Sequence, residues 1–306
     1  MTIWDLEFSQ RIRAIINTDA KNEADDQYAI IHALLSPSLE VRGLIAAHFG
    51  VRRGAHSMEE SRQEIDHLVK LAGLEGTVRV ENGAEFAMPD ARTASDSPGA
   101  RLIIEEAMRE SAMPLYVAFL GPLTDMAAAI LLEPRIVERD ITVVWIGGAA
   151  YSGFEQLRGG RPEFNLSNDI AAANVVFSSG INIWQIPSST YRTIAVGYAE
   201  LYEKVRPFGD LGQYLVEQLV QFNVDHPHEG RSIEYRALGD SPAVGVMLAP
   251  HAAWWRDQAA PQFRYDGSYD HSSPGHPIRV YESVDTRFIM EDFFAKIRAH
   301  VARGLK

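Results

Sequence analysis

The chain has 306 residues, of which 46% are hydrophobic and 23% charged, a composition typical of a globular protein with a sizeable buried core. Its 29 basic and 41 acidic residues give a formal net charge of −12, which disfavours nucleic acids and anionic membranes as partners and favours a bound cation. The absence of cysteine excludes disulfides, zinc–thiolate sites, iron–sulfur clusters and a thiol nucleophile.

Short apolar runs alternate with amphipathic stretches along the first part of the chain, which is typical of βα units. Strands are predicted over residues 12–17, 41–47, 77–80, 115–120, 141–146 and 181–186. Helices are predicted over residues 25–35, 57–71, 99–111, 122–132 and 169–178. The pattern predicts an α/β protein with an open, mostly parallel β-sheet flanked by helices.

This alternation fades after residue 187. Two helices, at about 209–223 and 241–249, flank a polar stretch, and a loop or hairpin over 261–277 precedes a strand at 278–281 and a helix from residue 285. No internal repeat or linker divides the sequence, so we predict a single domain over residues 1–306. Neither a signal-peptide core nor an apolar run of transmembrane length is present, so we expect a cytoplasmic protein.

An acidic loop joins the first predicted strand to its helix and reads NTDAKNEADD over residues 17–26. Open α/β sheets bind ligands at the carboxyl ends of their strands, so this loop is well placed for a site. Its crowded carboxylates repel one another unless a cation neutralises them, and their oxygens suit Ca²⁺ or Mg²⁺. The alternative is that Glu23, Asp25 and Asp26 only stabilise the N-terminus of the following helix.

Three further segments are candidates for the same crevice, namely GPLTD at 121–125, EFN at 163–165 and LGDSP at 238–242. Each motif is weak alone. In this order and spacing, over roughly residues 11 to 303, they resemble the inosine–uridine-preferring nucleoside hydrolase family. The resemblance implies a Rossmann-like nucleoside hydrolase fold, a Ca²⁺ ion at the bottom of a ribose pocket, and a homodimer or homotetramer.

The resemblance also implies a role for individual residues. The implied metal ligands are Asp19, Asp26, Asp240 and the main-chain carbonyl of Leu120. The implied substrate-binding residues are Asp25, Glu163 and Asn165, and His48, at the end of the second strand, is a candidate for a ribose or base contact. Asp19 would deprotonate the attacking water, and the N-glycosidic bond of a nucleoside or related riboside would be hydrolysed.

The sequence departs from the family pattern in two places near these motifs. Gly239 stands where many purine-cleaving members carry a histidine that protonates the leaving base, and Asn17 stands where many carry aspartate. The polar stretch before Gly239 offers other candidates for the acid, unless it is only a solvated loop: His226, His228, Glu229, Glu234, Tyr235 and Arg236. The arginines at 158 and 161 would meet an acidic substituent or pair with carboxylates of their own loop.

Two other functions compete with this interpretation. A metal-dependent ribose or nucleoside binder would keep the metal ligands and sugar contacts but would have lost turnover together with the acid at Gly239. A metal-dependent phosphohydrolase would need an aspartate nucleophile within a DxDxT signature, and the loop around Asp19 lacks that signature.

Overall fold

The main sheet positions everything else in this protein. The computed structural model describes residues 3–8, 11–51, 54–151, 162–227, 232–273 and 275–304. In these residues an eight-stranded sheet has the order β3-β2-β1-β4-β5-β6-β12-β9, and every neighbouring pair is parallel except β12 with β9. Its strands, in chain order, are β1 (Ile12–Thr18), β2 (Leu39–Ala46), β3 (Val80–Asn82), β4 (Leu115–Phe119), β5 (Ile141–Ile146), β6 (Asn182–Ile186), β9 (Ala253–Ala259) and β12 (Pro277–Val284).

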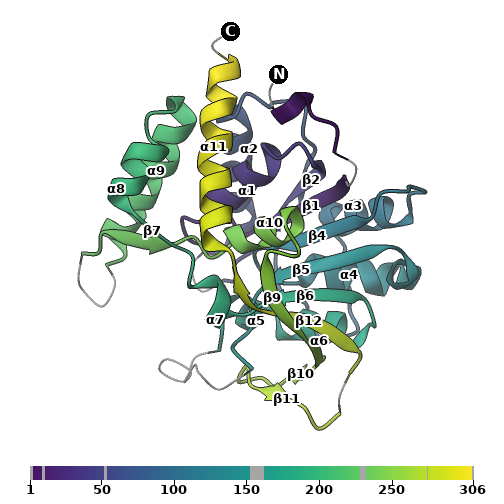
Figure 1. Cartoon of the computed structure of the whole chain (residues 1–306). Coiled ribbons are helices and arrows are strands. Elements are labelled where there is room, and N and C mark those ends of the chain that lie inside the picture. Colours follow the sequence, from purple (N-terminus) through teal and green to yellow (C-terminus); the bar gives the residue numbers. More distant parts are fainter. Residues whose placement is uncertain are drawn as a thin grey trace.

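Helices cover both faces of this sheet (Figure 1). The longer helices of the described chain are α1 (Asp26–Leu34), α2 (Ser57–Leu71), α3 (Pro98–Met108), α4 (Thr124–Leu132), α6 (Ile170–Ser178), α9 (Gly209–Asp225), α10 (Ser241–Leu248) and α11 (Thr286–Gly304). Shorter elements are α5 (Phe164–Asn168), α7 (Ser188–Tyr191), α8 (Tyr198–Lys204), two 3₁₀ turns (Ile3–Asp5 and Pro134–Glu138), and the antiparallel pairs β7 (Ala195–Gly197) with β8 (Tyr235–Ala237) and β10 (Gln262–Phe263) with β11 (Tyr269–Asp270).

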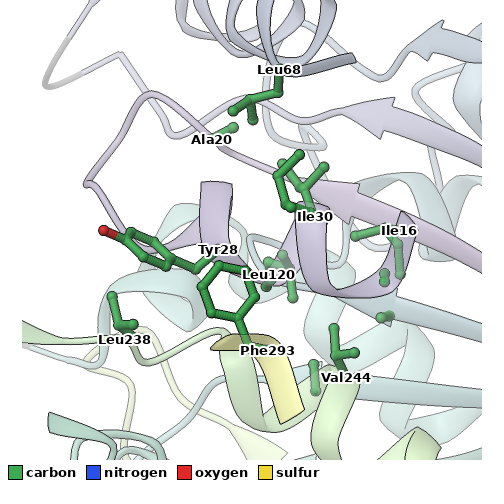
Figure 2. Packing of buried hydrophobic residues seen from close by; sticks show 14 of the residues in the cluster. Ile16, Ala20, Tyr28, Ile30, Leu68, Leu120, Leu238, Val244 and Phe293 are labelled. Carbon is green, nitrogen blue, oxygen red and sulfur yellow. The ribbon is translucent and has the colours of Figure 1, made fainter. Parts of the chain in front are cut away.

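The alternation of side chains along β1 explains the two helical layers. Ile15 points into an apolar cluster with α3, α4 and α6, whereas Ile16 points into a second cluster with α1, α10 and α11. Successive side chains of a strand face opposite sides of the sheet, so a strand buried on both faces reads as a continuous apolar run. Figure 2 shows the second cluster, where the rings of Tyr28 and Phe293 lie 5.5 Å apart between α1 and α11.

The order in which the chain adds strands to the sheet reverses at β1. From β1 the chain builds outward to β2 and β3 on one side and then to β4, β5 and β6 on the other. Such a switch point leaves a crevice beyond the carboxyl ends of the two central strands, because their connections leave toward opposite faces. The loops that follow β1 and β4 therefore border the crevice.

The predicted open, mostly parallel α/β sheet is confirmed, and the segment 261–277, predicted as a loop or hairpin, contains the antiparallel pair of β10 and β11. The strand predicted at 77–80 lies later, at Val80–Asn82. The prediction omitted β9, which carries Trp254 and Trp255 and forms the antiparallel edge of the sheet. None of the described helices combines the length and the apolar character needed to cross a membrane.

We expect Phe293→Ala to lower the free energy of unfolding by about 3–5 kcal/mol, because the side chain is buried and its removal leaves a cavity between α1 and α11. Denaturant unfolding would measure the loss. Tyr265→Ala is a matched control, since that ring is 99% exposed and its removal should change the value by less than about 0.5 kcal/mol. Equal losses in the two variants would contradict this description of the core.

Candidate functional site

The acidic loop after β1 folds back on itself at the switch point. The Asn22 amide donates to the Asp19 carbonyl at 2.8 Å, and the Gln27 side chain donates to the Ala20 carbonyl at 2.6 Å. Ala20 is fully buried, which holds the loop against the core. The turn therefore returns the two aspartates at the start of α1 to the end of β1.

Asp25, Asp26 and Asp240 form a buried triad, in which one carboxylate oxygen of each lies within 4.8 Å of the others. The Thr18 hydroxyl donates to Asp26 at 2.5 Å, and the Gly239 amide donates to Asp25 at 2.9 Å. Burial, together with the charge of neighbouring carboxylates, raises the pKa of Asp25 to about 6 and that of Asp26 to about 8. The same two causes raise the pKa of Asp240 well above its ordinary value.

Asp19 lies beside this triad, at the end of β1. Its Oδ2 atom is buried and has no hydrogen-bond partner among the described residues. Burial, followed by repulsion from Asp26, raises the pKa of Asp19 well above its ordinary value. Gly121 allows this close packing, because a Cβ atom there would lie 2.9 Å from the Asp19 Cγ atom. A buried oxygen without a donor is costly, so the position calls for a positively charged or hydrogen-bearing ligand.

The ends of β4 and β5 are joined by Asn165. Its side-chain amide donates to the Leu120 carbonyl at 2.6 Å and to the Ile146 carbonyl at 2.8 Å. Both Leu120 and Asn165 border the same cavity as the acidic triad. The structure thus brings the Leu120 carbonyl to the crevice and gives it an amide partner there.

Glu163 caps α5 and accepts four hydrogen bonds. The backbone amides of Gly148 and Leu166 donate to its Oε2 at 2.8 and 2.9 Å. The Asn165 amide and the Tyr191 hydroxyl donate to its Oε1 at 3.2 and 2.9 Å. Three of the four donors are fixed backbone groups, and only Tyr191 contributes a side chain.

These residues border a cavity of about 690 Å³. Six carboxylate side chains line it, namely Asp19, Glu23, Asp25, Asp26, Glu163 and Asp240. Other polar side chains complete the wall on the side of α7 and β8, namely Tyr191, Arg192, Tyr235 and Arg236. A concave space with converging polar groups is the usual setting of a ligand site.

The predicted sugar contact His48 lies elsewhere and is not among the described residues that line this cavity. Its Nε2 atom is 2.8 Å from the Thr124 hydroxyl, which itself donates to Asp169 at 2.8 Å. Burial lowers the pKa of His48 to about 4, so the imidazole is neutral at pH 7. The structure therefore places His48 in a polar network at the start of α4 and α6.

The histidine candidates for the leaving-group acid gain no support from the geometry. His226 is exposed at the end of α9, where its ring stacks on Phe222 at 4.4 Å, and it does not line the described cavity. Glu234 is described but is also not part of that lining. Several predicted residues lie outside the described part of the chain: Arg158, Arg161, His228 and Glu229.

Sequence reasoning missed Tyr191, which belongs to α7 and borders the cavity. The available signal was its place in the chain, five residues after Ile186 at the end of β6. Loops that follow parallel strands share one edge of the sheet, so the segment after β6 could have been included among the site segments.

The donor set fits a hard divalent cation. Only oxygen atoms are offered by Asp19, Asp25, Asp26, Asp240 and the Leu120 carbonyl. The Asp19 Oδ2 atom has no hydrogen-bond partner among the described residues, and Asp19, Asp26 and Asp240 repel one another. Carboxylate and carbonyl oxygens are the ligands of Ca²⁺ and Mg²⁺, so a metal ion of this class suits the site.

We expect Gly121→Ala to reduce kcat/KM by at least about 10-fold, because the added methyl group must displace the Asp19 carboxylate. Steady-state kinetics with a ribonucleoside, the substrate class that the family resemblance implies, would measure the effect. Gly197→Ala is the matched control, since a Cβ atom there meets its nearest neighbour only at 3.9 Å and should leave kcat/KM unchanged. An unaltered Gly121→Ala enzyme would show that the position of Asp19 is not critical.

Comparison with known proteins gives consistent results. A family model described as inosine-uridine preferring nucleoside hydrolase matches residues 14–291. The pyrimidine-specific ribonucleoside hydrolase RihA of Salmonella typhimurium is 25% identical over 247 residues, covering 74% of this chain and 76% of that protein.

Solved structures share the fold. A purine-preferring ribonucleoside hydrolase from Gardnerella vaginalis superposes with a TM-score of 0.76 at 22% identity, covering 94% of this chain and 99% of that one. The plant nucleoside hydrolase PpNRh1 superposes with a TM-score of 0.73 at 18% identity and the same coverage.

Proposed function

The chain belongs to the inosine-uridine preferring nucleoside hydrolase family, and we propose that it hydrolyses the N-glycosidic bond of a ribonucleoside or related riboside with the help of Ca²⁺. Membership makes the chain an N-glycosyl hydrolase of ribonucleosides, in a family of metal-dependent enzymes. Beyond family membership, we propose that the ion is Ca²⁺ and we assign roles to individual residues.

One observation carries the proposal. Four aspartates from the acidic loop and the start of α10 are buried together at one end of a cavity, and one of them keeps a buried oxygen without a donor. Asp19, Asp26, Asp240 and the Leu120 carbonyl would hold the ion. When bound, the ion would supply the positive charge that lowers the pKa of a water molecule in the site.

Residues of the chain itself would accept the proton, bind the sugar and stabilise its developing charge. Asp19 takes a proton from the attacking water. Asp25, held by the Gly239 amide, and Glu163, held by backbone amides, bind hydroxyl groups of the sugar, and Asn165 lies beside them. Their negative charge stabilises the positive charge that develops on the sugar ring as the base departs.

A second candidate is a metal-dependent riboside binder without turnover, favoured by the absence of a side chain at Gly239. Turnover separates the two, because both would bind metal and sugar. We further propose a single domain, a cytoplasmic location and a homodimer or homotetramer; the exposed Trp254 on the edge strand β9 suits an interface between copies.

We expect the wild-type protein to bind Ca²⁺ and Asp240→Asn to weaken that binding by more than about 10-fold, because the variant removes a charge from the proposed ligand set. Isothermal titration with calcium chloride would measure the affinity. Asp66→Asn is the control, since this exposed carboxylate on α2 pairs only with Arg62 in the described contacts. Equal affinities in Asp240→Asn and the wild type would contradict the ligand assignment.

We expect calcium-dependent release of ribose from at least one member of a panel of uridine, cytidine, inosine, adenosine and nicotinamide riboside. A reducing-sugar assay with added calcium or with a chelator would measure it, and the chelator should remove the activity. A folded, calcium-bound protein that binds a riboside yet releases no sugar would favour the binder instead.

A further inference from the structure

We propose that Tyr191 donates a hydrogen bond to the departing base during hydrolysis and that Gly239 leaves room for the Tyr191 ring, which packs against it. The inference rests on the proposed hydrolase function and adds a residue to it. The ring and the hydroxyl of Tyr191 make separate contacts, and each supports the proposal.

The ring of Tyr191 lies directly against Gly239. A Cβ atom on Gly239 would lie 3.0 Å from the Tyr191 Cδ2 atom and 3.2 Å from the Asp25 Oδ2 atom. Both contacts are tighter than most real Cβ contacts, so a larger residue at 239 would push the Tyr191 ring or the Asp25 carboxylate slightly aside. The phenol thus fills the position between α7 and the start of α10, next to the carboxylate triad.

The hydroxyl of Tyr191 occupies an exchangeable position. Glu163 accepts three hydrogen bonds from backbone amides, which are fixed by α5 and by the end of β5. The fourth comes from Tyr191, so it is the donor that a sugar hydroxyl can replace. Once replaced, the phenol is free to turn toward the base, since its ring is half-buried and already borders the cavity.

Tyr191 is also suited to act as a donor. Burial and the nearby Glu163 charge raise its pKa well above the usual value, so the hydroxyl keeps its proton at neutral pH. Another donor on this wall is engaged in structure, since Arg236 pairs with Glu23, donates to Asn223 and stacks on Phe222. Tyr191 contacts both Glu163 and Gly239, so it lies between the proposed sugar site and the triad.

Hydrolysis breaks one bond at the sugar carbon and forms another. The bond between C1′ and the base nitrogen breaks, and its electron pair goes to the base. The water oxygen forms a bond to C1′ while the water proton goes to Asp19. The Tyr191 hydroxyl donates a hydrogen bond to the base as negative charge develops there, which lowers the barrier in the manner of an oxyanion donor. The released base takes a proton from solvent, and Asp19 returns its proton to solvent.

The test compares Tyr191→Phe with the wild type on two kinds of substrate. One is the best nucleoside of the panel, and the other is p-nitrophenyl riboside, whose leaving group is a stable anion that needs little help. We expect kcat on the nucleoside to fall about 100-fold in Tyr191→Phe while KM does not rise, because the variant keeps the ring and removes only the donor that competes for Glu163. The rate with p-nitrophenyl riboside should stay within about 2-fold.

Two controls make the result specific. Tyr202→Phe removes a hydroxyl from an exposed ring on α8 and should leave both rates unchanged. Thermal unfolding of Tyr191→Phe should match the wild type. A series of nucleosides whose bases differ in acidity gives a second readout, in which the loss in Tyr191→Phe should grow as the base becomes a poorer leaving group.

Equal losses with both substrates, or a loss independent of base acidity, would overturn the proposal and show that Tyr191 acts on the sugar or on the fold. No loss with nucleosides would overturn it in favour of another donor. A wild type that hydrolyses no substrate would instead contradict the proposed hydrolase function, and the role of Tyr191 would fall with it.

Discussion

The site depends on the electrostatic cost of burying four aspartates together. A carboxylate loses hydration when it leaves water, and its neighbours add repulsion, so each charge must be compensated locally. The Thr18 hydroxyl donates one hydrogen bond to Asp26 and the Gly239 amide donates one to Asp25, while the buried Asp19 Oδ2 atom has no partner among the described residues. A bound cation would compensate this clustered charge, and Gly121 leaves room for the Asp19 carboxylate beside the triad.

The position of β1 makes this concentration of charge possible. Because β1 lies at the switch point, the loops after it and after β4 end in one crevice, and α10 enters the same space from the far end of the chain. The crevice has two unlike ends. Toward the proposed sugar site, Glu163 and Asn165 are bonded to backbone groups at the ends of β4 and β5, which gives a rigid wall. The rest of the wall consists of side chains from α7 and β8, whose positions depend on their rotamers.

Particular elements show where sequence reasoning succeeds. Strands such as β5 (Ile141–Ile146) were predicted at their observed bounds, because burial on both faces leaves an apolar run that little else explains. The edge strand β9 was missed, because it is buried only in part and its charged residues hide the strand pattern. The position of His48 after β2 predicts a sugar contact, whereas in the structure its imidazole lies beside the Thr124 hydroxyl.

The sequence by itself determined the α/β class, the acidic loop and the motifs that resemble the family, because these depend on local composition, spacing and order. It also identified Gly239 as a departure from the family pattern. Only the tertiary structure decided which side chains meet. Asp25 and Asp240 belong to one triad, and the Tyr191 ring packs against Gly239. Both contacts join segments that are far apart in the chain. Such contacts depend on the packing of strand ends at the switch point, and no local pattern of residues encodes their distances.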